Sequence, residues 1–397
     1  MRSARQLACL AVALSAFGIP SALSPAKSAH TDLTADALLA TVYDEISRGR
    51  VDAALQNIEG LISVKPNFRL AQLIKGDLLM ARAGPIDTLG AAPNAPAARI
   101  DDLRAEAFAR LRAYRDPPPT DRVPRYLLQM REDQKYAVVV DTHLSRLYLY
   151  QNDGGKPRFV ADYYVSSGKN GALKAREGDE RTPVGVYHVT ASLPRAKLAE
   201  FYGSGAFPIN YPNEWDQIQG RNGHGIWLHG TPPDTYSRPP RSSNGCVVLA
   251  NADLNDLAHN LQIGLTPVII SEDVEWLSAD DWAAERKEFR EQLDGWRADW
   301  ESLDADRYLA HYSKRFSANG QNLDAWSRYK RLVNGGKSWI KVKVDNVSMF
   351  RNPGKEELVV VTFDQEYRSN NLTNTTKKRQ YWIREDGLWR IVYEGTG

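Results

Sequence analysis

The sequence predicts a multidomain fold with an α-helical N-terminal module, a mostly-β sandwich domain in the middle and an α+β domain at the C-terminus. Three observations lead to this prediction. The chain has 397 residues, which is more than a single hydrophobic core usually organises. Apolar residues recur at helical spacing up to three consecutive prolines at 117–119, and strand-like segments begin at Tyr136. Long amphipathic helices and then further strands make up the last part.

The bulk composition is that of a folded soluble protein. Hydrophobic residues make up 42% of the chain and charged residues 25%. The formal net charge is only +2, so the chain has no strong field to attract nucleic acid, and we expect no nucleic-acid partner.

The first residues resemble a secretory signal peptide, which we place at residues 1–29. Arg2 and Arg5 precede an apolar run and then small residues. The apolar run is shorter than the roughly 20 residues that span a bilayer, so we expect an exported, periplasmic protein that does not span the membrane. Loss of Cys9 with the signal leaves Cys246 as a lone thiol in an oxidising compartment, where a thiol is either inert and buried or kept for its reactivity.

The N-terminal module is expected over residues 30–116. Helical periodicity interrupted at Gly49 and Pro66 looks like one tetratricopeptide-type unit, which alone is no solenoid. We interpret this module as a packing or protein-contact element, with envelope proteins as candidate partners. Residues 117–135 are predicted to be a Pro-containing linker.

The middle domain is expected over residues 136–271. Short apolar segments bounded by Gly and Pro predict strands at 136–141, 147–150, 158–165, 184–189 and 266–270. One helix is expected at 252–261. This pattern predicts a compact sandwich.

The last part, residues 279–397, is expected to place helices at 279–302 and 305–317 before strands at 340–350, 357–368, 377–384 and 388–393. This order resembles the cone-shaped NTF2-like domain. Its aromatic-rich concavity is interpreted in two ways: as a ligand site, or as a dimer surface and support for folding.

Residues 225–249 carry the chemistry. Strand alternation places Trp227 and His229 on one face, and Cys246 follows Gly245 where a tight turn enters a buried strand. Free cysteine is only a few per cent thiolate at neutral pH, so a neighbouring imidazole is needed to take its proton. His229 is the candidate base. Backbone N–H groups at Gly245 and Cys246 are candidates for an oxyanion site. The alternative is a buried structural cysteine with a structural histidine.

Two motifs support the catalytic interpretation. They are His229-Gly230-Thr231 and Ser243-Asn244-Gly245-Cys246, together with Thr182-Pro183-Val184-Gly185 upstream. This set resembles the signature of the L,D-transpeptidases with the YkuD fold, and with the NTF2-like part it is similar to the cell-shape-determining L,D-carboxypeptidases.

The sequence departs from the family pattern at two positions. Asn244 replaces the usual His, and Val248 stands where a polar residue, often Arg, is usual. The resemblance implies that oxyanion or substrate contacts come from Gly230, Ser243, Asn244 and Gly245. Arg241 or Arg238 is a candidate to hold a substrate carboxylate in place of the missing arginine.

The resemblance also implies a reaction. The Cys246 thiolate would attack the carbonyl at the L-centre of diaminopimelate in a tetrapeptide stem of peptidoglycan, release D-alanine and leave a thioester. An amine acceptor then gives L,D-transpeptidation; water gives L,D-carboxypeptidation, the alternative reading. No cofactor or metal is expected. The remaining alternatives are a non-catalytic envelope scaffold and a sortase-like enzyme, and the 17-residue spacing and Val248 disfavour the latter.

Overall fold

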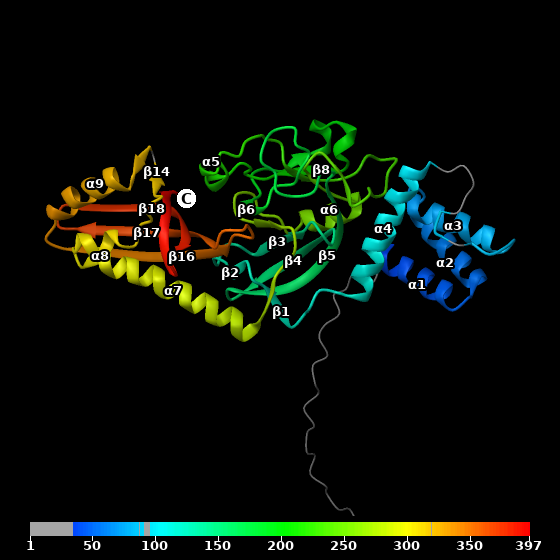
Figure 1. Cartoon of the computed structure of the whole chain (residues 1–397), viewed down its shortest axis with the longest axis horizontal. Coiled ribbons are helices and arrows are strands. Elements are labelled where there is room, and N and C mark those ends of the chain that lie inside the picture. Colours follow the sequence, from blue (N-terminus) through cyan, green and yellow to red (C-terminus); the bar gives the residue numbers. More distant parts are fainter. Residues whose placement is uncertain (1–34, 87, 91–95, 319) are drawn as a thin grey trace, which may run out of the picture.

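The computed structural model describes residues 35–86, 88–90, 96–318 and 320–397. Three parts follow one another along the molecule: a helical module, a β-rich middle part, and a sheet flanked by a long helix (Figure 1). The predicted three-part fold class is confirmed. The expected signal peptide lies outside the described residues, and none of the described helices is long and apolar enough to cross a membrane.

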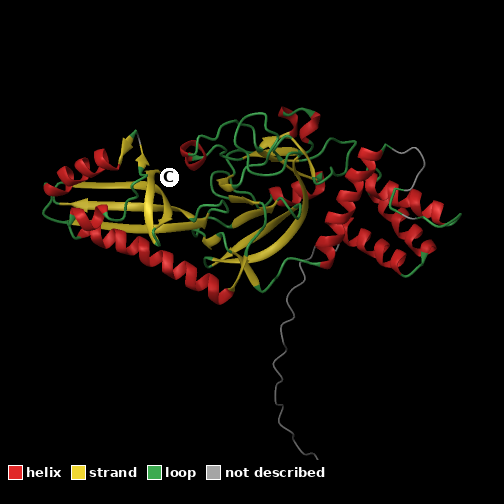
Figure 2. Cartoon of the chain, in the orientation of Figure 1, coloured by secondary structure: helices red, strands yellow, loops and turns green. Residues whose placement is uncertain are grey.

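The N-terminal module is entirely helical (Figure 2). Its helices are α1 (Ala35–Ser47), α2 (Val51–Val64), α3 (Arg69–Ala81) and α4 (Ala97–Arg115). Gly49 adopts a φ of 70°, which is accessible to glycine at little cost and lets the chain turn between α1 and α2. Leu39, Ile58 and Ile74 form part of the buried interior, so one amphipathic face of each of α1–α3 is packed inward.

The middle part contains one continuous mixed sheet. Its strands are β3 (Tyr136–Asp141), β4 (Arg146–Asp153), β5 (Lys156–Gly168), β6 (Gly185–His188), β7 (Leu193–Pro194), β8 (Gly205–Pro208), β9 (Trp227–His229), β10 (Arg241–Ser243), β11 (Val247–Leu249) and β12 (Pro267–Ser271). The order is β6-β12-β3-β4-β5-β11-β9-β8-β7, and β10 pairs with β5. The sheet curls in the manner of a half-barrel around one main core, which α6 (Asn251–Ala258) helps to close. A short helix, α5 (Glu214–Ile218), lies beside the C-terminal part (Figure 1).

The C-terminal part is α+β. It consists of β13 (Trp276–Ser278), α7 (Ala279–Glu301), α8 (Ala305–Leu309), β14 (Ser317–Ala318), β15 (Gln321–Asn322), α9 (Leu323–Gly335), β16 (Ile340–Arg351), β17 (Leu358–Ser369), β18 (Leu372–Glu385) and β19 (Leu388–Thr396). The strands from β16 to β19 form an antiparallel sheet, and α7 runs along it (Figure 1).

Two helical predictions in this part were wrong. The helix expected to reach residue 317 ends at Leu309, because the following backbone pairs with β19: Ser313 N–H donates to Ile391 O at 2.9 Å and Ile391 N–H to His311 O at 2.7 Å. Helix α9 was not predicted. The helix is amphipathic, but two of the three residues on its buried face, Lys330 and Asn334, are polar.

The segment expected as a linker, 117–135, contains two strands. The first, β1 (Arg122–Pro124), pairs with β13, and the second, β2 (Leu127–Gln129), extends the C-terminal sheet beyond β16. A core shared by the two parts lies behind this pairing, with Tyr148 and Ile269 from the middle part packed with Tyr381. The segment therefore joins the two parts instead of separating them.

Aromatic side chains fill the interior of the C-terminal part. Trp296, Tyr308 and Trp382 are fully buried. The Lys330 ammonium lies 4.4 Å from the centroid of the Trp326 ring, and burial lowers the pKa of Lys330 to about 8. The aromatic residues noted in the sequence thus act as core in this structure.

Candidate active site

Two parallel-paired strands bring the predicted catalytic residues to one face of the sheet. In the β9–β11 pairing Val247 is opposite Leu228, and Val248 is opposite His229. Leu228 and Val247 both point into the core. Since side chains alternate along a strand, His229 and Cys246 project from the opposite face, on neighbouring strands.

His229 is buried and its tautomer is defined by its surroundings. Its Nδ1 lies 2.7 Å from the carbonyl oxygen of Gly230. A carbonyl only accepts, so Nδ1 carries the proton and Nε2 keeps its lone pair. Burial, with a smaller contribution from the nearby Arg238 guanidinium, lowers the pKa of His229 to about 4. The imidazole is therefore a neutral base at physiological pH.

Cys246 is half-buried, directly before β11. Its Sγ donates to the carbonyl of Gly225 at 3.3 Å. Burial raises the pKa of the Cys246 thiol, while a backbone hydrogen bond from Trp227 and the charges of Arg238 and Lys174 oppose that rise. The resting pair is therefore thiol and imidazole, not thiolate and imidazolium.

The turn before Cys246 is closed by Ser243. Its hydroxyl accepts from the Gly245 N–H at 3.0 Å and donates to the Cys246 carbonyl at 2.6 Å. The predicted oxyanion role of Gly245 needs correction on this point, because its N–H is committed to the turn. Gly245 has a φ of 125°, and a Cβ there would lie 2.6 Å from the Arg181 carbonyl oxygen, so only glycine fits.

Thr182 joins this turn to β5. It is fully buried, accepts from the Gly168 N–H at 2.8 Å and donates to the Gly245 carbonyl at 3.0 Å. The Thr-Pro-Val-Gly segment seen in the sequence thus supports the turn before Cys246.

Gly230 allows close packing at the base of the site. A Cβ at Gly230 would lie 2.1 Å from Asn251 Oδ1. That amide also accepts from the Ser204 N–H at 2.8 Å and donates to the Thr231 carbonyl at 2.8 Å. Asn251, which the sequence interpretation did not assign to the site, therefore ties the segment after His229 to Ser204, next to β8.

Two aromatic residues missed by the sequence analysis cover His229. The Tyr202 ring meets the imidazole edge-on at 5.1 Å between centroids, and the Phe201 ring lies at 5.7 Å. They lie in a short 3-10 helix (Glu200–Tyr202) between β7 and β8, which is too short for a periodic pattern to reveal. Their packing accounts for the burial that lowers the pKa of His229.

The arginines and Asn244 that were predicted to contact substrate differ in their distance from His229 and Cys246. Arg238 stacks on Phe201 with its guanidinium carbon 4.3 Å from the ring centroid, and its charge acts on both His229 and Cys246. Arg241 is exposed at the start of β10, and Asn244 is exposed in the turn. Of the two candidate arginines, the structure brings Arg238 to the site.

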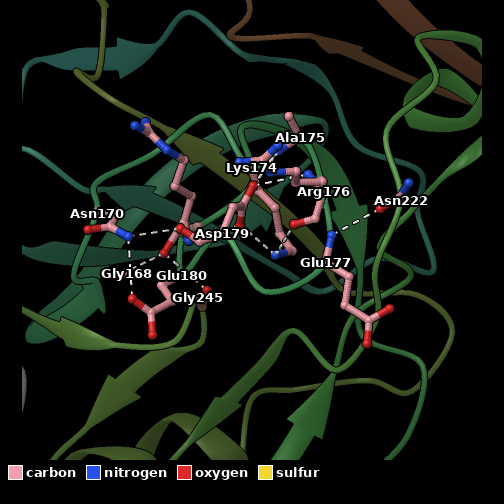
Figure 3. Close-up of polar contacts among 12 residues, drawn as sticks. Gly168, Asn170, Lys174, Ala175, Arg176, Glu177, Asp179, Glu180, Asn222 and Gly245 are labelled. Atoms are coloured by element: carbon pink, nitrogen blue, oxygen red, sulfur yellow. Dashed lines mark hydrogen bonds and ion pairs between the residues drawn. The ribbon is translucent and has the colours of Figure 1, made fainter.

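The loop between β5 and β6 is held by a network of polar contacts (Figure 3). Asp179 accepts from the backbone N–H groups of Ala175 and Arg176 and from the Lys174 ammonium at 2.7 Å, and these contacts hold its pKa well below the usual range. Buried Lys174 is thereby fixed where its charge acts on Cys246. Among the described residues, no cluster of His, Cys, Asp or Glu is arranged to hold a metal ion.

Comparisons with known proteins match two parts of the chain to described domains. Residues 135–270 match the L,D-transpeptidase catalytic domain (YkuD), and residues 288–395 match the Cds6 C-terminal NTF2-like domain. Bd1075 of Bdellovibrio bacteriovorus is 27% identical, with a TM-score of 0.63 over 70% of this chain and 98% of its own. The helical cell shape determining protein Pgp2 of Campylobacter jejuni shares the fold at 24% identity, with a TM-score of 0.58 over 68% of this chain and 95% of its own. No curated protein matches the sequence.

Replacing Thr182 with Val should destabilise the protein by about 1–3 kcal/mol, because the Gly168 N–H and the Gly245 carbonyl lose their buried partner. Thr182→Ser, which keeps the hydroxyl, is the matched control. Denaturant unfolding of both variants measures the effect. Equal stability of Thr182→Val and the wild type would show that the bridge does not hold the turn.

The alkylation rate of Cys246 by iodoacetamide should rise with a midpoint above the ordinary cysteine pKa of about 9, because burial disfavours the thiolate and His229 is uncharged above about pH 4. Peptide mass spectrometry after timed alkylation at a series of pH values measures this. A midpoint between pH 5 and 7 would instead indicate a thiolate–imidazolium pair.

Proposed function

We propose that this chain, which contains a YkuD-type L,D-transpeptidase catalytic domain and a Cds6-type NTF2-like domain, modifies peptidoglycan stem peptides through a thioester on Cys246. The observation that carries the proposal is the arrangement of Cys246 and His229 on one sheet face, with His229 Nδ1 bonded to a carbonyl and Nε2 left as the base.

In the first step His229 Nε2 takes the thiol proton as Sγ attacks the carbonyl at the L-centre of diaminopimelate. We assign the developing oxyanion to the Cys246 N–H, since the Gly245 N–H is bonded to Ser243. Collapse of the tetrahedral intermediate breaks the peptide bond. The imidazolium returns its proton to the departing D-alanine amine, and the acyl group remains on sulfur.

The low pKa of His229 suits both halves of this step. A base that is neutral at pH 7 is ready to accept a proton, and its conjugate acid, with a pKa of about 4, readily gives the proton to a leaving amine. In the second step His229 deprotonates the acceptor, and the acceptor displaces the thiolate.

The acceptor determines the reaction class. An amine acceptor gives an L,D-transpeptidase, which is our main proposal. Water gives an L,D-carboxypeptidase that trims tetrapeptide to tripeptide. The fold shared with a helical cell shape determining protein supports this second candidate, and with it a role in cell shape. A purely scaffolding role is disfavoured by the complete Cys246, His229 and Thr182 arrangement.

We also infer that the enzyme works outside the cytoplasm, in the periplasm. This inference is supported by the signal-like residues 1–29 and by a peptidoglycan substrate, which lies outside the cytoplasm.

Purified enzyme incubated with tetrapeptide-rich cell-wall digests should release D-alanine. His229→Gln should lower the rate by at least about a hundredfold through loss of the base, and Cys246→Ala should abolish it. His224→Gln is the matched control, because the His224 side chain is 80% exposed. Muropeptide chromatography with mass detection is the measurement.

The same digest identifies the acceptor. New crosslinks between diaminopimelate residues, or exchange of added D-amino acids, support transfer. Tripeptide alone would exclude transfer and leave the carboxypeptidase. Full activity of Cys246→Ala would contradict both.

A further inference from the structure

The loop that connects His229 to Cys246 is held by the helical N-terminal module. This loop, residues 231–240, contains four prolines and Arg238. Its middle leaves the catalytic domain and packs on the module, where the partly buried Tyr236 joins the module's own core. The module therefore contacts the active site's framework directly.

The first set of contacts surrounds Tyr236. Its N–H donates to the Asn67 carbonyl at 3.2 Å, and its ring lies 4.6 Å from the Phe68 ring and 5.7 Å from the Lys65 ammonium. The Asn67 side chain donates to the Pro233 carbonyl at 3.0 Å. Side-chain and backbone contacts thus fix the loop to the turn between α2 and α3.

The second set reaches Arg238 itself. Ser237 donates to Glu106 at 2.6 Å, and buried Glu106 pairs with Arg110 at 2.9 Å. The Arg110 guanidinium covers the Tyr164 ring at 3.9 Å, and the Tyr164 hydroxyl donates to the Arg238 carbonyl at 2.8 Å. A continuous chain of contacts therefore runs from α4 to the backbone of Arg238.

Buried charges anchor the module to the sheet at the same place. Asp36 of α1 pairs with Arg110 and, at 2.8 Å, with Arg146 of β4, which also pairs with Asp162 of β5. Arg110 and Arg146 are at most 6% exposed. Because breaking a buried ion pair leaves an uncompensated charge, displacement of the module is costly.

Arg238 faces the site without a carboxylate partner. In the described part of the chain its guanidinium forms no ion pair; it stacks on Phe201, which in turn covers His229. The carbonyls after it are fixed by β5, since the Ser166 hydroxyl donates to Pro239 O and the Ser167 N–H to Pro240 O. A fixed, uncompensated arginine beside a nucleophile is suited to bind a carboxylate.

We propose that the N-terminal helical module is a positioning element of the active site: through Tyr236, Ser237 and Tyr164 it holds Arg238 beside Cys246, where Arg238 binds the terminal carboxylate of the stem peptide. The identity of that carboxylate rests on the proposed function. The positioning of a positive charge near Cys246 is independent of the proposed function.

The first test uses thiol alkylation and needs no substrate. The rate ratio of iodoacetate to iodoacetamide at Cys246, relative to a small free thiol, reports the positive charge near Sγ. Arg238→Met should lower this ratio on the order of three- to tenfold, as expected for one nearby charge. Tyr236→Ala should lower it in the same direction. Tyr114→Ala, an exposed tyrosine of α4, is the matched control.

A smaller change than Tyr236→Ala tests the same role with less risk that the variant fails to fold. Ser237→Ala removes only the hydroxyl that reaches Glu106 and should also lower the ratio. If Tyr236→Ala and Ser237→Ala keep the wild-type ratio while Arg238→Met loses it, the positioning role is overturned. If Arg241→Met lowers the ratio and Arg238→Met does not, the assignment to Arg238 is overturned.

The second test uses a tetrapeptide stem and the same stem with a C-terminal carboxamide. Wild-type enzyme should have a lower KM for the stem with a free carboxylate than for the stem with a carboxamide. Arg238→Met and Tyr236→Ala should reduce that preference, with kcat changed less. Equal preference in wild type and Arg238→Met would overturn carboxylate binding. If neither stem is turned over but the alkylation ratios shift as expected, the proposed function fails and the positioning role stands.

Discussion

The hydrogen bond from Thr182 to the Gly245 carbonyl joins two segments 63 residues apart and holds the turn that precedes Cys246. It ties the turn before Cys246 to β5, while the β9–β11 pairing fixes His229 relative to that turn. Such a buried hydrogen bond contributes most to stability when its loss leaves two buried polar groups without partners, as it would here. The chemistry therefore depends on a rigid turn supported by the sheet.

The two outer parts are fixed to the catalytic domain in different ways. The C-terminal part shares an apolar core with it and extends its own sheet with β2. The N-terminal module is attached through buried ion pairs around Arg110 and through the 231–240 loop. Of the two, the N-terminal module is the part that contacts the loop between His229 and Cys246.

Much of this architecture was predictable from the sequence, because strand and helix periods are local. The His229 and Cys246 pair followed from two short motifs. Phe201 and Asn251 did not, because their roles arise from contacts between distant segments. Helix α9 was not predicted although its sequence is amphipathic, and its buried face includes the polar residues Lys330 and Asn334. The correction at Gly245 likewise depended on a side-chain hydrogen bond that sequence spacing does not specify.

The claim that Cys246 is the nucleophile is tested most directly by intact-protein mass spectrometry after incubation with a carbapenem, whose strained β-lactam amide should acylate the thiol. We expect one adduct per chain, located on the peptide that contains Cys246 and absent from Cys246→Ala. An adduct on another residue, or one that persists in Cys246→Ala, would contradict the account.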